Sequence, residues 1–225
     1  MFEGHACFSI HIAGLSVLID PFISNNPLCS TPLEQFHPDI VLVTHGHDDH
    51  LGDALEIARS ARAELAATVE LLSMLDTSGI EIVPFNIGGS FQRGKLNIRM
   101  VNAIHGSNIE TDGGIFYGGL ACGYVLSSPE GSVYHAGDTA LFGDMSSVIS
   151  AYQPDVALLP IGDRYTMGPD DALRAVQWIK PKYVIPMHYN TFPAIEQDAN
   201  HFAKMVGLHT QSKAIVLQPG ENILL

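Results

Sequence analysis

A cluster of histidines and aspartates is the feature of this sequence that could do chemistry. The segment HGHDDH, residues 45–50, places three imidazoles and two carboxylates side by side. This mixture suits a borderline-hard divalent cation such as zinc, manganese or iron, whereas a soft metal ion would need thiolates that three scattered cysteines do not assemble. In an extended turn His45 and His47 can point the same way, while Asp49 and His50 face a neighbouring position about 3.5 to 4 Å away. One short segment therefore predicts ligands for two metal ions.

Further ligands are expected from other loops, because a site for two ions draws on several loops at one edge of its scaffold. Three polar residues stand where an apolar run gives way to a loop: His105, Asp138 and His188. Each of them alone could simply be a polar group that caps a turn. Together with HGHDDH, they present metal-ligand side chains at four separate junctions, and we predict that they complete the site.

The elements that must position these residues follow from hydrophobic patterning. The apolar run IVLVT, residues 40–44, predicts a buried strand that leads directly into HGHDDH. Further strands are predicted at residues 8–12, 15–20, 63–67, 96–104, 122–127, 132–135, 156–160, 183–187 and 214–218. Helices are predicted at residues 52–62, 68–75, 145–152, 169–179 and 197–206.

This order of elements predicts an α/β fold. Strands alternate with helices in both halves of the chain, and the middle is rich in antiparallel hairpins. Such a pattern favours two mixed β-sheets packed face to face, with helices on the outer faces. No composition shift or linker divides the chain, so residues 1–225 are expected to form one domain.

Composition narrows the range of partners. The net charge of −13 and the absence of a basic run argue against nucleic acid, although bound cations would still allow a small anionic substrate. No apolar run is long enough for a membrane span, so no membrane partner is expected, and a homo-oligomer is compatible with the sequence. An odd number of cysteines without CxxC spacing, and no secretory leader pattern, indicate the cytoplasm.

The full set of motifs resembles the metallo-β-lactamase superfamily. The resemblance lies in HxHxDH, the later His105, the GDT aspartate Asp138 and His188 at a last strand end. Closer similarity to one branch, the uncharacterised metal-dependent hydrolases related to L-ascorbate 6-phosphate lactonases, comes from longer runs: the Gly4-His5 pair, DPF, HAGDTALF, LPIGD with TMGPDDA, and PMHYNTFPAIEQD. Arg164 and Tyr165 depart from the branch pattern in a loop expected to face the substrate.

The resemblance implies an αββα fold and a particular division of ligands. His45, His47 and His105 would hold one metal ion; Asp49, His50 and His188 would hold the other. Asp138 would bridge the two ions together with a water or hydroxide. Zinc is the first expectation for both ions, with manganese or iron as alternatives.

This site predicts a hydrolase in which a bridging hydroxide attacks a small ester, lactone or phosphoester. Asp138 and Asp49 are the predicted catalytic carboxylates, and Asp49 could also transfer a proton. His5, His135 and Asn190 are candidate substrate contacts, and His5 and Asp20 are candidate partners that orient a ligating imidazole. Two alternatives stay open: a binding or sensor protein that keeps the metals without turnover, and a redox protein that holds two irons.

Overall fold

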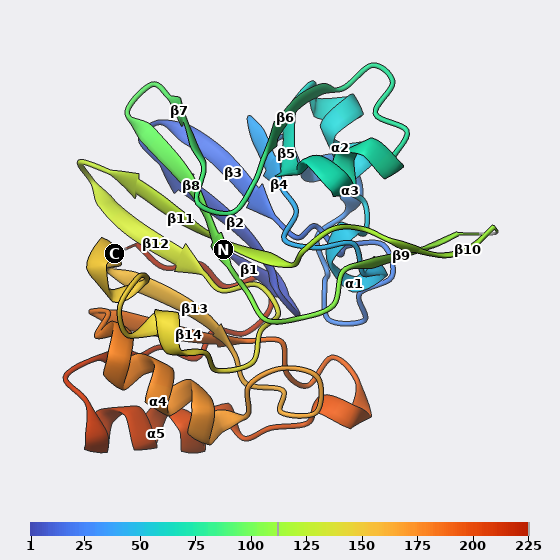
Figure 1. The fold of residues 1–225 in the computed structure, drawn as a ribbon. Coiled ribbons are helices and arrows are strands. Elements are labelled where there is room, and N and C mark those ends of the chain that lie inside the picture. The colour runs from blue at the N-terminus through green and yellow to red at the C-terminus, as the bar shows by residue number, and fades with distance from the viewer. Residues whose placement is uncertain (112, 225) are drawn as a thin grey trace.

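The computed structural model describes residues 1–111 and 113–224 as two β-sheets, a projecting two-stranded ribbon and flanking helices (Figure 1). The first sheet has six strands that follow one another in chain order: β1 (Phe2–Gly4), β2 (Cys7–Ile12), β3 (Leu15–Ile19), β4 (Ile40–Leu42), β5 (Glu64–Thr68) and β6 (Glu81–Phe85). The first three strands pair antiparallel and the pairs from β3 to β6 are parallel, so this sheet is mixed.

The second sheet has seven strands in the order β15-β14-β13-β12-β11-β8-β7. In chain order these are β7 (Ser90–Arg93), β8 (Leu96–Asn102), β11 (Cys122–Ser128), β12 (Gly131–His135), β13 (Val156–Pro160), β14 (Tyr183–Met187) and β15 (Lys213–Ala214). The pairs from β7 to β12 are antiparallel, and those from β12 to β15 are parallel. The predicted hairpin-rich middle thus forms the antiparallel half of this sheet.

Apolar side chains from both sheets meet in the interior. Within β8, Leu96, Ile98 and Met100 are fully buried, while the alternating residues Asn97 and Arg99 are only partly buried. Because burial alternates with a period of two residues, one face of the strand points toward the opposite sheet. The inner faces of the first sheet contribute to the same apolar cluster, so the sheets pack face to face as predicted.

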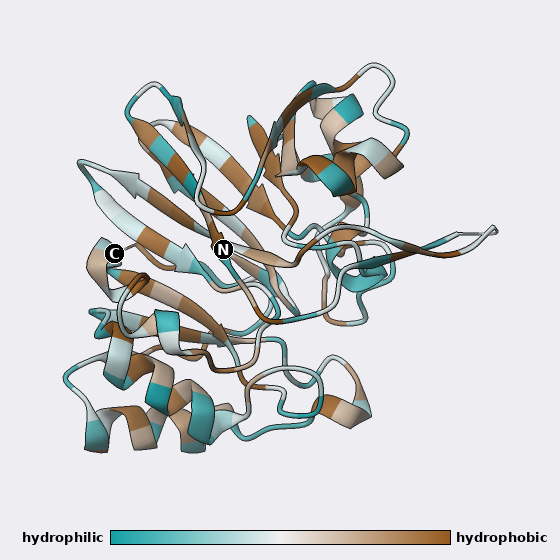
Figure 2. Cartoon of the chain, in the orientation of Figure 1, coloured by the Kyte–Doolittle hydropathy of each residue, from teal (hydrophilic) through white to brown (hydrophobic). Residues whose placement is uncertain are grey.

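Helices cover the outer faces of the two sheets. Near the first sheet lie α2 (Ala54–Ala61) and α3 (Val69–Met74), and near the second lie α4 (Pro169–Ile179) and α5 (Ala199–His209). The buried residues of α4 recur at helical spacing: Ala172, Ala175, Val176 and Ile179. Figure 2 shows mostly apolar strands between helices that carry polar residues on their outer faces. The predicted α/β architecture with helices outside is therefore confirmed.

The helix predicted at residues 145–152 is wrong. The structure has two single 3-10 turns there, Gly143–Met145 and Ser150–Tyr152. The Ser146 hydroxyl donates to the Gly143 carbonyl and the Ser150 hydroxyl donates to the Ser146 carbonyl. Serine side chains that compete for backbone groups in this way weaken a continuous helix.

Several short strands were not predicted because their patterns are weak. β6 contains Pro84, and such a residue is tolerated at a sheet edge, which is where β6 lies. The ribbon of β9 (Asn108–Thr111) and β10 (Gly114–Tyr117) leaves every residue of β10 exposed, so no burial pattern marks it. Within the described ranges, no helix combines the length and apolar character needed to cross a membrane.

Candidate metal centre

The loops that carry the predicted ligands lie at one edge of the sandwich. Because β8, β12 and β14 run in the same direction within the second sheet, the loops that follow them share an edge. These loops contain His105, Asp138 and His188. The fourth loop follows β4 of the first sheet and carries HGHDDH, which continues into α1 (Asp48–Leu51).

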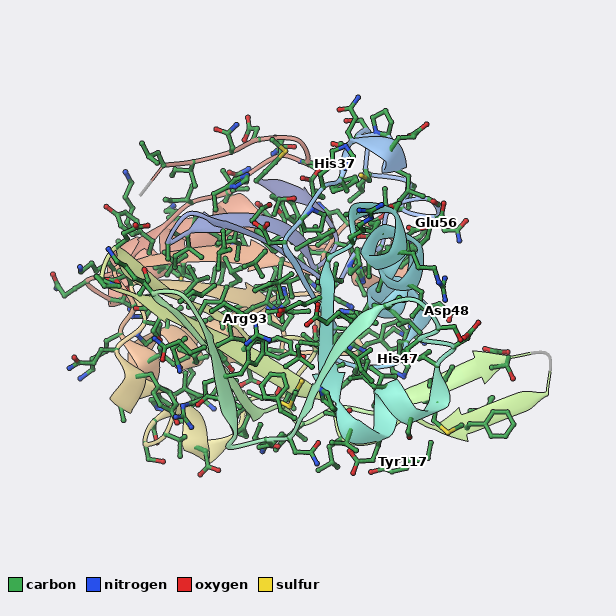
Figure 3. All side chains as sticks on the ribbon, turned by 90° about the horizontal axis from the view of Figure 1, so that it is seen from above. His37, His47, Asp48, Glu56, Arg93 and Tyr117 are labelled. Atoms are coloured by element: carbon green, nitrogen blue, oxygen red, sulfur yellow. The ribbon has the colours of Figure 1, made fainter. Side chains whose placement is uncertain are left out.

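The structure brings all seven predicted ligands together. Three groups of side chains place their ligand atoms within 4.8 Å of one another: His45, His47 and His105; His45, His50 and Asp138; and His5, Asp49, His50 and His188. The remaining carboxylate of the motif, Asp48, belongs to none of these groups and is exposed. Figure 3 shows Asp48 beside His47 on the side of the molecule from which the ribbon projects.

Asp138 joins the parts of this cluster. Its Oδ2 lies 2.9 Å from His188 Nε2 and 3.5 Å from His105 Nε2, and its Oδ1 lies 3.3 Å from His50 Nε2. Burial opposes ionisation of this carboxyl, but the charges and contacts of His188 and His50 hold its pKa well below the usual value. One buried carboxylate therefore faces imidazoles from three different loops.

The backbone conformation of the preceding glycine positions Asp138. The preceding Gly137 has φ of 62°, and a Cβ at that position would lie 2.5 Å from the Cys122 carbonyl oxygen. Only glycine fits so close an approach in this conformation. His188 and Asp20 also have positive φ, at 54° and 50°. Backbone strain of this kind concentrates at functional sites.

Hydrogen bonds determine which ring nitrogens face the site. The Thr44 hydroxyl donates to Asp20 Oδ2 over 2.7 Å, so its oxygen is left to accept from His45 Nδ1, 3.0 Å away. His47 Nε2 lies 2.8 Å from the Asn108 side-chain oxygen, which can only accept. In their neutral forms, His45 Nε2 and His47 Nδ1 are therefore unprotonated, and these two atoms lie 3.0 Å apart.

Asp20 also orients a second predicted ligand, His50. Its Oδ2 lies 2.8 Å from His50 Nδ1, and both side chains are fully buried. A carboxylate bonded to one ring nitrogen directs the other nitrogen outward, an arrangement that recurs beside metal ions in proteins. Burial opposes a charge on His50, but Asp138 and Asp20 raise its pKa well above the ordinary value. The same two carboxylates would favour a bound cation.

The donor set fits metal ions. His5 Nε2, His50 Nε2 and Asp138 Oδ1 are buried without a hydrogen-bond partner among the described residues. Such atoms are costly unless something else satisfies them. Burial and neighbouring His50 also lower the pKa of His45 well below its ordinary value, which keeps this imidazole in the neutral form that binds metals. Nitrogen atoms 3.0 Å apart can share one ion with bonds of about 2.0–2.1 Å.

The cluster opens on one side. His45 and His50 are fully buried, whereas the side chains of Asp49 and His105 are 32% and 15% exposed. Burial opposes ionisation of Asp49, but contacts with His5 and His50 lower its pKa from the usual value. A substrate can therefore reach a charged carboxylate from solvent.

The three candidate substrate contacts have different surroundings. His5 lies inside the cluster and is fully buried. His135 is also fully buried: its Nε2 donates to the Ala6 carbonyl and its Nδ1 accepts from the Gly137 amide, so neither nitrogen is free. Asn190 is exposed, and its side-chain oxygen accepts from the Gln197 amide, which closes a loop beside His188.

Asp20, predicted from the sequence as an orienting partner, does contact His50, but three further partners of the cluster were not predicted. Thr44 and Asn108 bond the predicted ligands His45 and His47, and Thr191 bonds His5 Nδ1 over 2.9 Å. Thr44 and Thr191 each lie within three residues of a predicted ligand, which is the signal that could have found them. Asn108 lies three residues beyond His105, but it reaches His47 rather than its own neighbour.

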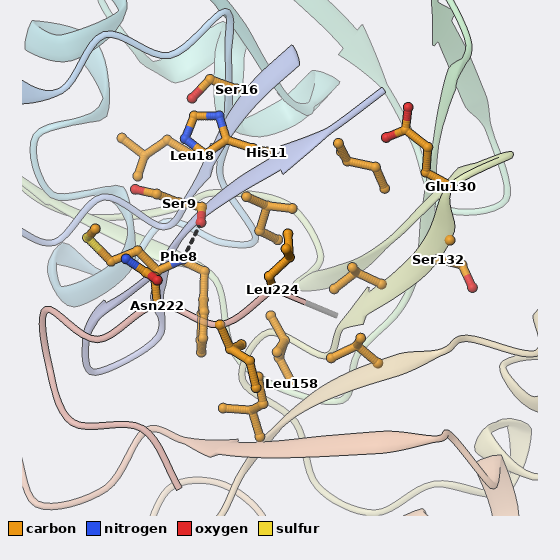
Figure 4. Close-up of a pocket in the computed structure, with 18 of the residues that line it drawn as sticks. Phe8, Ser9, His11, Ser16, Leu18, Glu130, Ser132, Leu158, Asn222 and Leu224 are labelled. Atoms are coloured by element: carbon orange, nitrogen blue, oxygen red, sulfur yellow. Dashed lines mark hydrogen bonds between the residues drawn. The ribbon is translucent and has the colours of Figure 1, made fainter. Parts of the chain in front are cut away.

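A large cavity lies away from the His/Asp cluster. A space of about 1350 Å³ opens at the opposite end of the sandwich, where Phe8, Leu18, Leu158 and Leu224 contribute apolar side chains (Figure 4). None of the described residues lining it belongs to the His/Asp cluster. Because the chemistry-bearing side chains converge at the other edge, we place the candidate site there rather than in this cavity.

Comparisons with known proteins show the family to which the chain belongs. Residues 1–188 match the family described as "Beta-lactamase superfamily domain". A relative from Methanosphaera stadtmanae, named "UPF0173 metal-dependent hydrolase", is 50% identical over 97% of this chain and 96% of that protein. Another metal-dependent hydrolase, from Methanopyrus kandleri, is 49% identical with the same coverage of both chains.

A solved structure also matches the whole fold. It is a metallo hydrolase from the hyperthermophilic archaeon Ignicoccus hospitalis, 39% identical to this chain. The TM-score is 0.90, and the match covers 99% of this chain and 96% of that one. The arrangement of both sheets is therefore shared with a known metallo hydrolase.

Proposed function

Because the chain belongs to the β-lactamase superfamily and is a metal-dependent hydrolase, we propose that it cleaves a small ester, lactone or phosphoester with two divalent cations. The observation that supports two ions is the position of Asp138. Its carboxylate lies within 3.5 Å of His105 at one end of the cluster and of His188 at the other. A single ion would leave either His105 or His188 without a metal ion to bind.

The proposed ligands divide into two sets. His45, His47 and His105 would hold the first ion, which agrees with their forming one group of converging ligand atoms. The second ion would take Asp49, His50 and His188, which also converge. Asp138 would be shared, since it contacts His50, His105 and His188. The unpartnered His50 Nε2 and Asp138 Oδ1 support this assignment.

Two bound divalent cations lower the pKa of water toward neutrality and so supply hydroxide as a nucleophile near pH 7. The residues around them hold the arrangement: Asp20 and Thr44 keep His45 and His50 in the orientation that presents Nε2. Asp49 is the proposed carrier of a proton to the leaving group, because its carboxylate is ionised and partly open to solvent.

A loop beside Asp138 is the proposed source of substrate preference. Thr139, next to Asp138, accepts at its carbonyl from the Met167 amide over 2.9 Å, so this loop is tied to the site. Arg164 and Tyr165 of the same loop are exposed. An exposed guanidinium would attract an anionic group such as a phosphate or carboxylate. A small anionic substrate is therefore the favoured class.

Zinc, manganese and iron are all compatible with a set of histidines and aspartates. We propose zinc first at the three-histidine position, since nitrogen-rich sites with one carboxylate suit it. The alternative is a protein that binds the ions and a ligand without turnover. The following experiment distinguishes this binding protein from a hydrolase.

The test combines metal content with hydrolysis. Protein purified without chelator is analysed for metal per chain and assayed against ester, lactone, phosphomonoester and phosphodiester panels. Asp138→Asn is compared with Asp48→Asn, whose carboxylate lies outside the cluster. About two ions per chain, with hydrolysis lost only in Asp138→Asn, supports the proposal. Two ions per chain with no turnover of any substrate would favour the binding protein, and fewer than two would overturn the two-ion site.

A further inference from the structure

His5 has the surroundings of a ligand rather than of a packing residue. It lies in the loop between β1 and β2, and its side chain is fully buried. Its ligand atom converges with those of Asp49, His50 and His188 within 4.8 Å. His5 was predicted to contact substrate or to orient a ligand, and neither role needs a nitrogen inside the group of ligand atoms.

The two ring nitrogens of His5 differ in the way expected of a metal ligand. Nδ1 lies 2.9 Å from the Thr191 hydroxyl. Nε2 lies 3.2 Å from Asp49 Oδ2, yet it is buried without a hydrogen bond of acceptable geometry among the described residues. His50 repeats this pattern, with Nδ1 bonded to Asp20 and Nε2 unpartnered. An imidazole that is anchored through one nitrogen and unsatisfied at the other is suited to bind an ion.

A hydrogen bond from His5 to Asp49 is the competing explanation. It would satisfy Nε2 without any ion, and the distance of 3.2 Å allows it. However, the contact fails the geometric criteria for a hydrogen bond, so Nε2 stays unsatisfied although Asp49 lies close enough to affect the pKa of His5. The two groups lie side by side without a well-formed bond, and their ligand atoms converge with those of His50 and His188, which is the arrangement of neighbouring ligands.

The backbone holds His5 in this position. Its φ of 57° is in the left-handed region, which is unfavourable for a residue with a side chain. Its carbonyl oxygen accepts from the His188 amide over 2.7 Å, and the ring centroids of the two histidines are 4.1 Å apart. The loop is therefore fastened directly to another proposed ligand.

We infer that His5 is a protein ligand of the second ion, which would then be held by three imidazoles together with Asp49 and the shared Asp138. This inference rests on the proposed two-ion function. Five protein groups exceed the four that tetrahedral zinc takes in structural sites, and they suit ions that accept five or six ligands, such as Mn²⁺ or Fe²⁺. The two positions would consequently differ in metal preference, with the second favouring Mn²⁺ over Zn²⁺ more strongly than the first.

The variant His5→Gly offers a direct test, because glycine adopts a positive φ readily and leaves a space of the size of an imidazole. Metal-free wild type, His5→Gly and Thr191→Val are titrated with Mn²⁺, and free Mn²⁺ is followed by its electron paramagnetic resonance signal. The wild type should bind two ions. His5→Gly should bind the second at least 100-fold more weakly, more than the loss of about 10- to 100-fold typical when only an orienting partner is removed. Thr191→Val should stay within that smaller range.

A spectroscopic measurement separates a ligand from a residue that only positions Asp49. Imidazole labelled with ¹⁵N is added to His5→Gly loaded with Mn²⁺, and the hyperfine coupling of the ion to ¹⁵N is recorded. Recovery of the second ion together with direct ¹⁵N coupling supports the inference. Recovery without coupling, or wild-type affinity in His5→Gly, overturns it. Fewer than two ions in the wild type would instead overturn the proposed function, and circular dichroism of the metal-free variants checks that they fold.

Discussion

Asp20 Oδ2 lies 2.8 Å from His50 Nδ1, and neither side chain is exposed to solvent. The same oxygen accepts the Thr44 hydroxyl, which in turn bonds His45. A single buried carboxylate thus orients imidazoles that belong to different proposed metal positions. Because Asp20 belongs to none of the groups of converging ligand atoms, we expect it to affect the ions through these two histidines.

We expect Asp20→Asn to weaken binding of both ions. An amide can still accept one hydrogen bond, but it lacks the charge that supports His50, and losing such a partner costs about 10- to 100-fold in metal affinity. Isothermal titration of metal-free protein with Zn²⁺ measures the change. Asp48→Asn serves as the matched control, and an Asp20→Asn protein that binds both ions as tightly as this control would contradict the prediction.

Asp49→Asn and Asp48→Asn should behave differently although the residues are adjacent. Asp49 belongs to the group with His50 and His188, whereas Asp48 is exposed and outside every group. We expect Asp49→Asn to keep one ion per chain and to lower hydrolysis by about 100-fold or more, since it removes both a ligand and a candidate proton carrier. Asp48→Asn should retain two ions and nearly full activity. Equal effects of the two substitutions would show that the carboxylates are interchangeable.

His135 should matter for stability rather than for metal binding. Replacing it with alanine leaves the Ala6 carbonyl and the Gly137 amide without partners and creates a cavity, which together cost roughly 2–5 kcal/mol. Urea unfolding measures this loss, and metal content per folded chain should not change. If His135→Ala were instead stable and had an altered KM for substrate, His135 would be a substrate contact.

The metal-free protein should lose stability as the pH falls from neutrality. Burial lowers the pKa of His135, and burial lowers the pKa of His5 to about 4. An unfolded histidine takes up a proton near pH 6.5, so below about that value the unfolded chain binds protons that the folded chain does not. For His5 the loss continues down to about pH 4. The free energy of unfolding is measured across this pH range. In His5→Gln it should fall less steeply with decreasing pH than in the wild type, because one histidine with a lowered pKa has been removed.

Bound ions should raise stability by mass action. An ion present at about 100 times its Kd stabilises the folded chain by about 2.7 kcal/mol if it does not bind the unfolded chain. We expect the midpoint of urea unfolding to fall when EDTA is added to metal-loaded protein and to recover when excess Zn²⁺ or Mn²⁺ is restored. Asp138→Asn should respond less to the chelator. Identical midpoints in all conditions would mean that no ion is held by the folded state.

The parts that could be predicted from the sequence are those with local spacing. HGHDDH follows an apolar strand directly, so its loop position and its convergence with His105, Asp138 and His188 follow from the ends of strands. His5 is different, because nothing within its own segment relates it to His188, which is distant in sequence. Its place in the cluster depends on the pairing of β1 with β2 and on a backbone bond to His188.

Elements without strong burial could not be predicted in the same way. The ribbon is exposed along β10, and β7 alternates exposed and partly buried residues, so hydrophobic periodicity carries little information there. The expected helix at residues 145–152 has apolar residues at suitable positions, but the Ser146 and Ser150 hydroxyls bond the backbone carbonyls of Gly143 and Ser146. Organisation as one domain, the cytoplasm and a homo-oligomer stay predictions.

The bond between the His188 amide and the His5 carbonyl also ties two distant stretches of the chain to one another. The group that contains His5 draws its side chains from both of these stretches, whereas His45, His47 and His105 come from the first 105 residues alone. A proteolytic cut between His105 and His188 that let the two fragments separate would therefore divide the second group and leave the residues of the first group on a single fragment.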